Sequence, residues 1–198
     1  MVDCADTTQL LHHKVLARLL DPQGEAIAAG HFLPWIERLG WAARFDLAML
    51  EHTLEHLAEH RQPLALSLSG STLRDTTQRR IILDTLNSLP ELAPLLTLEI
   101  DEHQLPPPED LRQLSLSLRD TGYRIGLQHF GGSFSQIGNF TQLGLAYLKI
   151  DGSYIRGIDT QSHKRLFIEA IYRATHSIDL PLIAEMVETA GELEALKA

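Results

Sequence analysis

Residues 126–134 read Gly-Leu-Gln-His-Phe-Gly-Gly-Ser-Phe. The apolar run that leads into them, from Tyr123 to Leu127, predicts a buried strand, and the glycine pair predicts a turn. In an α/β barrel the carboxyl ends of the strands build the functional site, so Gln128 and His129 lie where chemistry is expected. A site for divalent metal ions favours carboxylates at such an edge. This strand offers an amide and an imidazole instead.

Strands alternate with helices on both sides of this stretch. The predicted strands are 10–17, 64–69, 95–100, 123–128, 145–150 and 180–185. The predicted helices are 32–39, 42–59, 76–89, 109–120 and 164–177, with a last one starting near Thr189. Near-continuous apolar strands that alternate with helices are typical of a parallel sheet covered by helices. These strands lack a dinucleotide-binding fingerprint, so the α/β pattern favours a TIM-like (β/α) barrel over an open doubly wound sheet.

The composition indicates one globular domain. The chain has 198 residues, 44% of them hydrophobic and 22% charged, which is ordinary for such a domain. Its formal net charge of −9 argues against a surface for DNA, RNA or an anionic membrane, because those partners need a basic face. The single cysteine, Cys4, excludes an internal disulfide and suits a reducing, cytoplasmic compartment. No apolar run approaches the length of a membrane span, and no signal peptide is visible.

Polar side chains recur at the predicted carboxyl ends of the strands. They are Lys14, Arg18, Ser67, Ser69, Glu99, Glu102, Gln128, His129, Lys149, Asp151, Glu185 and Glu188. Lys149 and Asp151 occupy alternate positions, so both are expected to face the barrel mouth. For any one of these residues the simpler interpretation is that strand ends are polar because they meet solvent. Their recurrence in nearly every strand–helix unit favours a shared site for the set.

The histidines and tryptophans are predicted to be structural or solvated. His52, His56 and His60 share one helix face at i, i+4 spacing, which suits zinc, yet no neighbouring glutamate or cysteine completes a site. A solvated helix face is the better interpretation. Trp35 and Trp41 flank a short helix and its turn, and we expect them to be core or staple residues and not a ligand cage.

Six fragments, read together, carry a family resemblance. They are Lys14-Val-Leu-Ala-Arg18, Ser67-Leu-Ser69, Leu98-Glu-Ile-Asp-Glu102, Gln128-His-Phe-Gly131, Leu148-Lys-Ile-Asp151 and Ile183-Ala-Glu-Met-Val-Glu-Thr189. In order and approximate spacing they resemble the EAL domain family, whose members are barrels that bind and hydrolyse the bacterial second messenger cyclic di-GMP. The resemblance covers essentially the whole chain. Its particular form is similar to the degenerate EAL domain of LapD-type receptors, which control biofilm adhesion.

The chain departs from the catalytic pattern of that family at several metal-binding positions. By the resemblance, Lys14 stands in place of a metal-binding glutamate and Ser67 in place of an asparagine. A pair of aspartates is replaced by Gln128 and His129. Hard cations need several anionic oxygen ligands, so no two-metal site and no metal-bound hydroxide are expected. Relative to the family pattern, these changes add roughly four units of positive charge, about what two divalent cations contribute.

Other positions keep the family pattern. Glu99 and Glu185 match metal-binding glutamates, and Lys149 matches a catalytic lysine. Arg18 matches the arginine of the first motif and suits forked contacts with phosphate or a guanine edge. The full set expected to bind the ligand is Leu16, Arg18, Ser67, Ser69, Glu99, Gln128, His129, Lys149, Asp151, Glu185 and Glu188.

The resemblance also implies a segment that passes ligand state onward. EAL domains generally form their dimer contact in this region, so a two-fold interface is expected. The expected dimer and switch residues are Gly131, Gly132, Phe134, Ile137 and Phe140. The two glycines are expected to give the segment backbone freedom. The alternative is that the apolar ridge after them simply packs on the barrel.

Together these features predict a catalytically inactive cyclic di-GMP receptor that needs no metal or other cofactor. We expect it to signal through conformational change and homodimerisation to other domains of a longer parent chain, without direct membrane contact. Two alternatives stay open: a residual metal-dependent phosphodiesterase, and a protein-interaction module that has lost the nucleotide. Residues 1–198 are expected to be one EAL domain clipped at both ends, because the resemblance implies a Gln-Pro segment before Val2 and a last strand after Ala198.

Overall fold

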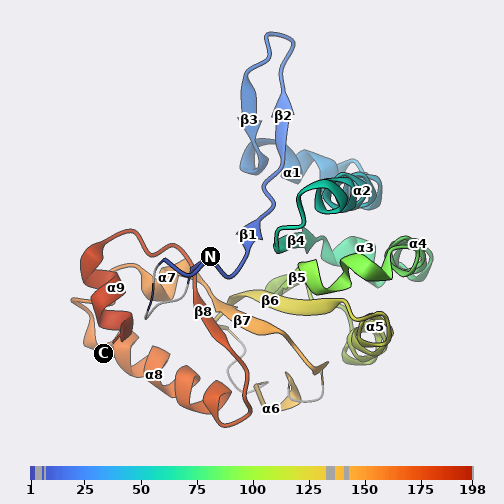
Figure 1. Ribbon diagram of the computed structural model, residues 1–198. Coiled ribbons are helices and arrows are strands. Elements are labelled where there is room, and N and C mark those ends of the chain that lie inside the picture. Colours follow the sequence, from blue (N-terminus) through green and yellow to red (C-terminus); the bar gives the residue numbers. More distant parts are fainter. Residues whose placement is uncertain (3–5, 7, 133–136, 141–142, 198) are drawn as a thin grey trace.

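The centre of the fold is a curved sheet of parallel strands. The computed structural model describes residues 1–2, 6, 8–132, 137–140 and 143–197. The strands of the sheet, in spatial order, are β1 (His13–Lys14), β4 (Leu64–Leu68), β5 (Leu96–Asp101), β6 (Arg124–Phe130), β7 (Tyr147–Ile150) and β8 (Leu182–Ala184). Each strand pairs in parallel with the next. The sheet forms a half-barrel with flanking helices, which confirms the predicted TIM-like α/β fold (Figure 1).

The central strands are buried on both faces, which explains their apolar composition. β4, β5 and β7 are almost completely buried. Leu66, Leu98 and Ile125 lie side by side in register on three neighbouring strands and belong to the main core. Glu99 and Lys149 lie within this layer and are fully buried. Buried charges of this kind need partners inside the protein.

Helices flank the sheet on its outer side (Figure 1). They are α1 (Ala29–Arg38), α2 (Ala42–His60), α3 (Gly70–Arg74), α4 (Thr76–Asn87), α5 (Pro108–Thr121), α6 (Ile137–Phe140), α7 (Gly152–Ile155), α8 (Ser162–His176) and α9 (Ala190–Lys197), with 3-10 turns η1 (Pro90–Leu95) and η2 (Glu102–Gln104). Leu50, Leu54 and Leu57 of α2 are buried, as their helical spacing predicts. Asp75 accepts hydrogen bonds from two backbone N–H groups and caps α4. None of the described helices combines the length and apolarity needed to cross a lipid bilayer.

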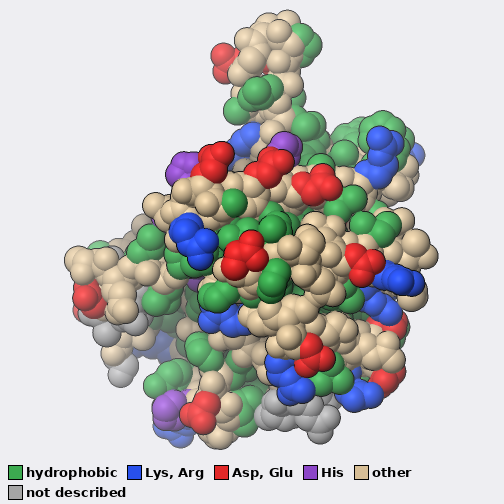
Figure 2. Space-filling model, turned by 45° about the vertical axis from the view of Figure 1, so that its right-hand side comes forward, with side chains coloured by type: hydrophobic (Ala, Val, Ile, Leu, Met, Phe, Trp, Pro, Cys, Tyr) green, Lys and Arg blue, Asp and Glu red, His purple; other side chains and the backbone are tan. Residues whose placement is uncertain are grey.

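A hairpin that the sequence analysis did not predict stands away from the sheet. It consists of β2 (Arg18–Leu20) and β3 (Ala26–Ala28), which pair antiparallel, and every residue of both strands is exposed (Figures 1 and 2). The strand predicted over 10–17 is correspondingly short, because β1 pairs with β4 only through His13 and Lys14. The chain leaves the sheet after Val15, whose backbone N–H still donates to the Ala65 carbonyl at 2.9 Å. A turn at 21–24 closes the hairpin, and Gly24 supplies its positive φ of 87°.

Neither tryptophan is a core residue, which was one of the two roles expected for them. Trp35 is 59% exposed and Trp41 49% exposed. α1 packs beside the hairpin and α2 through Phe32, whose ring meets Phe45 edge-on at 5.8 Å. The outer face of α1 therefore has no described layer above it, and Arg38 lies over the Trp35 ring at 5.7 Å. The histidine face of α2 is exposed, as predicted.

Candidate functional site

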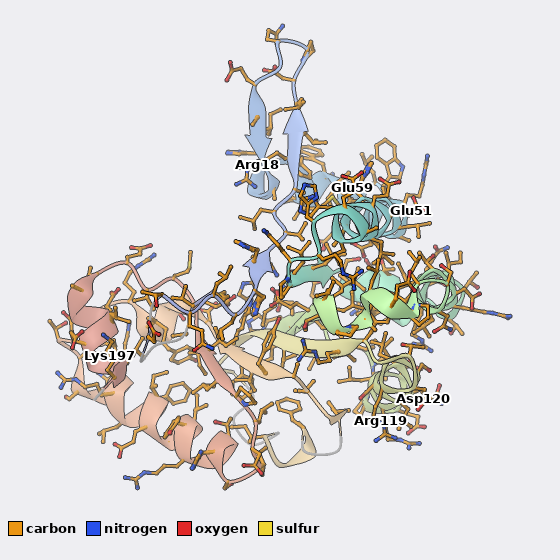
Figure 3. All side chains as sticks on the ribbon, in the orientation of Figure 1. Arg18, Glu51, Glu59, Arg119, Asp120 and Lys197 are labelled. Atoms are coloured by element: carbon orange, nitrogen blue, oxygen red, sulfur yellow. The ribbon has the colours of Figure 1, made fainter. Side chains whose placement is uncertain are left out.

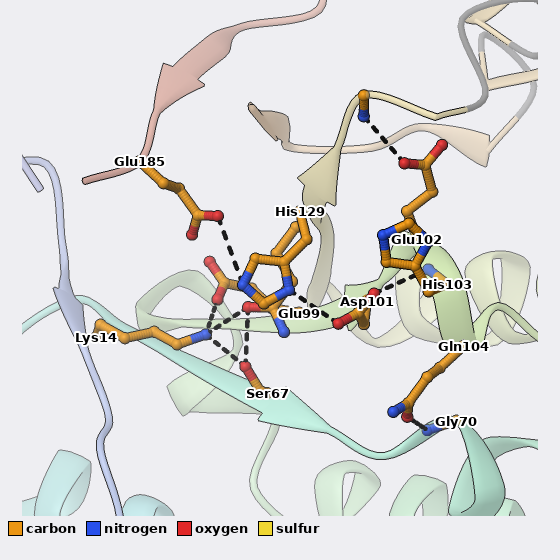
Figure 4. Close-up of polar contacts among 12 residues, drawn as sticks. Lys14, Ser67, Gly70, Glu99, Asp101, Glu102, His103, Gln104, His129 and Glu185 are labelled. Atoms are coloured by element: carbon orange, nitrogen blue, oxygen red, sulfur yellow. Dashed lines mark hydrogen bonds and ion pairs between the residues drawn. The ribbon is translucent and has the colours of Figure 1, made fainter. Parts of the chain in front are cut away.

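Lys14 ends β1 among polar side chains from three neighbouring strands. Its Nζ donates to Ser67 Oγ of β4 at 2.5 Å and to Gln128 Oε1 of β6 at 2.9 Å. The same ammonium forms an ion pair with Glu99 Oε2 of β5 (Figure 4). Ser67 Oγ in turn donates to Gln128 Oε1 at 3.0 Å. One ammonium group thus links four strands of the half-barrel.

Glu99 is shared between two lysines and a phenol. Its Oε1 forms an ion pair with Lys149, which is fully buried, and accepts a hydrogen bond of 2.6 Å from the Tyr147 hydroxyl. Burial by itself raises the pKa of Glu99, but Lys14 and Lys149 together outweigh it and hold the pKa below its ordinary value. Burial lowers the pKa of Lys14, and Glu99 opposes that shift. Glu99 is therefore an ionised carboxylate whose two oxygens are both occupied by donors.

His129 lies between two carboxylates at the end of β6. The ladder between β6 and β7 shifts register between Leu127 and Phe130, and His129 has a φ of 55°. Its Nδ1 lies 2.8 Å from Asp101 Oδ2, and its Nε2 lies 3.8 Å from Glu185 Oε2 (Figure 4). Burial raises the pKa of Glu185, and the nearby His129 is the largest opposing influence. The irregular backbone thus places the imidazole across the mouth of the site.

Two expected ligand residues form helix caps instead. Ser69 Oγ donates to Asp46 Oδ2 at 2.5 Å and accepts from the backbone N–H of Thr72, capping α3. Asp151 accepts from the backbone N–H of Ser153 at 2.8 Å, capping α7, and its hydrogen bonds with Ser153 lower its pKa. The expectation that Lys149 and Asp151 both face the barrel mouth stays a prediction, because Asp151 is also near enough to His129 for that side chain to lower its pKa. Only Lys149 joins the buried cluster.

Leu16, Arg18 and Glu188 also lie outside the cluster. Leu16 is 62% exposed. Arg18 begins the hairpin, and its guanidinium donates to the carbonyl of its own neighbour Ala17 at 2.8 Å (Figure 3). Glu188 is exposed and pairs with Arg156 at 3.3 Å. The first two residues are separated from the cluster because β1 ends at Lys14 and the chain then leaves the sheet.

The glycine pair after β6 is bound to Glu102. The backbone N–H groups of Gly131 and Gly132 donate to Glu102 Oε2 at 2.9 and 3.1 Å. Neither glycine has a positive φ, and the backbone freedom expected of them stays a prediction. Gly131 is needed for another reason, because a Cβ there would lie 2.1 Å from the Tyr154 ring. Gly131 therefore allows close packing.

The apolar ridge after the glycines packs inward wherever it is described. Ile137 is 6% exposed and Phe140 4% exposed. The Phe140 ring meets Phe130 edge-on at 5.9 Å. Phe134 lies outside the described residues. The described part of the ridge therefore belongs to the core, which was the alternative interpretation.

The divalent metal site that the family resemblance implies does not fit these side chains. Lys14 places an ammonium directly on the oxygens of Glu99, Ser67 and Gln128, and a metal ion there would meet a like charge. Within the described part of the chain, no group of three or more His, Cys, Asp or Glu side chains is placed to hold a metal ion. The cluster offers charged and hydrogen-bonding groups for a polar ligand.

Sequence reasoning missed two members of the cluster. Tyr147 contacts Glu99, and Asp101 contacts His129. Both carried a signal, because Tyr147 alternates with Lys149 on β7 and Asp101 alternates with Glu99 on β5, and alternate strand residues share a face. His12 carried the same signal, because it alternates with Lys14 in the predicted strand 10–17. It stacks on Tyr147 with ring centroids 5.1 Å apart, and burial lowers its pKa to about 4.

Comparisons with known sequences identify the family of the chain and several relatives. The family model described as "EAL domain" matches residues 1–198. The cyclic di-GMP phosphodiesterase PdeF of Escherichia coli is 26% identical over 192 residues, which are 94% of this chain and 26% of that protein. The oxygen sensor protein DosP, also of Escherichia coli, is 26% identical over 201 residues, which are 98% of this chain and 25% of that protein. The chain thus spans about a quarter of the length of these relatives.

Solved structures share the fold. An S helix-GGDEF-EAL chain of LapD from Vibrio cholerae, bound to c-di-GMP, superposes with a TM-score of 0.84 at 24% identity. That match covers 93% of this chain and 46% of the LapD chain. The FimX EAL domain from Pseudomonas aeruginosa, also bound to c-di-GMP, superposes with a TM-score of 0.80 at 25% identity. It covers 92% of this chain and 76% of the FimX chain.

Proposed function

The chain belongs to the EAL domain family, and from this membership we propose that it is a catalytically inactive receptor for cyclic di-GMP. The ligand is supported by the FimX EAL domain, a relative at 25% identity whose structure contains c-di-GMP. Among the curated relatives, PdeF is a phosphodiesterase, so hydrolysis is the activity against which this proposal stands. The difference between the two functions rests on the metal-binding positions.

The observation that carries the proposal is the occupation of Glu99. Lys14 takes one of its oxygens, and Lys149 and Tyr147 take the other. A metal ion bound to either oxygen of this carboxylate would lie beside an ammonium group, and hydrolysis in the family pattern depends on metal-activated water. The cluster keeps one partly exposed ammonium group, that of Lys14, with which to attract phosphate. Binding without hydrolysis is the function that such a site supports best.

The ligand-facing set that we propose is narrower than the one expected from sequence. It consists of the residues that the structure joins around Lys14: Ser67, Glu99, Gln128, His129, Lys149 and Glu185. Arg18 lies outside this cluster on the exposed hairpin. Its forked guanidinium suits a phosphate that reaches beyond the buried groups.

We also propose that nucleotide state leaves the domain through the segment after β6. Gly131 follows the ligand-facing strand directly and is bound by Glu102 on one side and by the Tyr154 hydroxyl on the other. A shift of the β6 end is therefore expected to move Glu102 of η2 and Tyr154 of α7, which both contact Gly131. The resemblance to LapD-type receptors favours dimerisation and control of biofilm adhesion as the output of that signal.

Incubation with cyclic di-GMP and Mg²⁺ or Mn²⁺, followed by chromatography, tests the proposal. We expect no linear dinucleotide above the level of a protein-free control. Calorimetric titration of the same protein with cyclic di-GMP in EDTA is expected to show binding. Linear product that forms at a rate proportional to protein concentration, or the absence of any binding, overturns the proposed function.

A further inference from the structure

The oxygen atoms around the end of the Lys14 side chain are of the kind that bind a metal ion, but the Lys14 ammonium group occupies the place of that ion. The three groups around its Nζ are a carboxylate oxygen of Glu99, the Ser67 hydroxyl and the Gln128 amide oxygen. An ammonium has three N–H donors, and here three acceptors from three different strands receive them. These three oxygens, of the kind that a hard cation would seek, are thus used by an internal cation.

We infer that Lys14 is a built-in replacement for a bound metal ion and is the residue that makes this site independent of metal. The inference deepens the proposed function. The part of it that concerns nucleotide affinity rests on that function. The part that concerns metal binding does not, because it involves only the protein and the ion. A positioning role follows as well, since the ammonium holds the ends of β1, β4, β5 and β6 in fixed relation.

A purely structural salt bridge would not need this arrangement. Glu99 already has Lys149, a fully buried lysine, on its other oxygen, so its charge is neutralised without Lys14. Lys14 therefore adds a second cation to one buried carboxylate. Its side chain keeps 22% of its surface exposed, whereas the Lys149 side chain has none. Of the two ammonium groups, that of Lys14 is the one that an entering anion can reach.

A matched pair of variants isolates residue 14. The first carries Ser67→Asn, Gln128→Asp and His129→Asp, which restore the family pattern at three positions and retain Lys14. The second carries the same three changes and Lys14→Glu. Binding of Mn²⁺ is measured for both by electron paramagnetic resonance, without nucleotide, after circular dichroism has shown that both are folded. We expect the second variant to bind Mn²⁺ and the first to bind at least about tenfold more weakly, since like charges repel at close range. Equal binding by the two variants overturns the inference.

A single substitution tests the nucleotide arm. Lys14→Met keeps the length of the side chain and removes its charge, and Lys197→Met on the exposed surface of α9 is its control. In EDTA we expect Lys14→Met to lower cyclic di-GMP affinity about 30-fold or more and Lys197→Met to leave it unchanged. Unchanged nucleotide affinity in Lys14→Met overturns the inference. The proposed function still stands in that case, because the wild type binds the nucleotide. Failure of the wild type to bind, with the Mn²⁺ difference intact, overturns the proposed function alone.

Discussion

At the residue scale, Glu99 shows how a charge can be kept in the middle of an apolar sheet. It is fully buried on β5, yet each of its oxygens faces an ammonium group. A buried ion pair contributes little net stability compared with apolar packing, but removal of one partner leaves an uncompensated charge. The two lysines would be left in that state if Glu99 lost its charge. The site is therefore a point where a small chemical change has a large effect on folding.

Glu99→Gln is predicted to destabilise the fold by about 3–5 kcal/mol, the usual result of breaking a buried pair. Urea unfolding followed by circular dichroism measures the change. Glu51→Gln, on the exposed face of α2, is the matched control and should lie within about 0.5 kcal/mol of wild type. Equal midpoints for Glu99→Gln and wild type would show that the carboxylate is not charged in the folded protein.

Glu185 is predicted to make the folded protein less stable as the pH rises. Burial raises its pKa above the ordinary value of 4.5, so above that pH the folded state binds more protons than the unfolded state. The free energy of unfolding therefore falls as pH rises from 4.5 through the raised pKa. Glu185→Gln has no proton to release, so its stability relative to wild type should increase from about pH 4 to about pH 7. Unfolding curves across this range check it, with exposed Glu188→Gln as control. Parallel pH profiles for Glu185→Gln and wild type contradict the prediction.

Cluster residues were predictable from the sequence where they lie on a regular strand of the sheet. Ser67, Gln128 and Lys149 were identified because each lies on a buried strand at the expected edge. Arg18 was expected beside them, yet β1 stops at Lys14 and no local pattern marks that end, since the following residues are also apolar. The contacts between Lys14 and its three partners depend on strand order and register, which sequence spacing does not specify.

At the element scale, the end of β6 is shaped by two adjacent glycines with different surroundings. A Cβ on Gly131 would lie 2.1 Å from Tyr154 Cε2, whereas a Cβ on Gly132 would have nothing closer than Glu102 at 3.7 Å. Neither residue needs a positive φ. The two positions therefore separate the effect of close packing from the effect of backbone conformation.

Gly131→Ala is predicted to destabilise the protein by about 1–3 kcal/mol, as overpacking commonly does. The added methyl group must displace the Tyr154 ring, which stacks on Phe167 at 4.5 Å. Gly132→Ala is the control and should be neutral or slightly stabilising, because alanine restricts the unfolded chain. Thermal unfolding of the two variants measures the difference. If they behave alike, the close approach of Tyr154 to Gly131 is not a constraint.

Elements with a strong period were predictable, and those held by tertiary contacts were not. The helices α2, α4 and α5 agree with their predicted spans to within about two residues, which is the normal uncertainty of helix ends. The hairpin of β2 and β3 was missed because its strands are three residues each and exposed throughout, so neither shows alternation. The outward position of Trp35 likewise depends on where α1 packs, not on its own sequence.

At the scale of the whole molecule, the site exists only when the half-barrel is assembled. Its members come from β1, β4, β5, β6, β7 and the residue after β8, so they are drawn from almost the full length of the chain. Any ligand that bridges them is bound by the sheet as a whole. The protein can exist in two states, such as two arrangements of the sheet, or monomer and dimer. The ligand shifts the equilibrium between them by no more than the ratio of its affinities for the two states.

The last prediction follows from that linkage. If cyclic di-GMP favours self-association through the segment after β6, then association must favour cyclic di-GMP by the same factor, commonly about 5–150-fold. Light scattering should show a larger dimer fraction with nucleotide, and calorimetry should show apparent affinity that rises with protein concentration. Glu102→Gln weakens the acceptor that holds Gly131 and Gly132, so it should reduce this coupling. Glu109→Gln, an exposed change on α5, is its control and should preserve the coupling. If the protein is a monomer at every concentration, with and without nucleotide, the signal does not leave the domain by dimerisation. If the protein dimerises but its nucleotide affinity does not depend on protein concentration, dimerisation and nucleotide binding are not coupled.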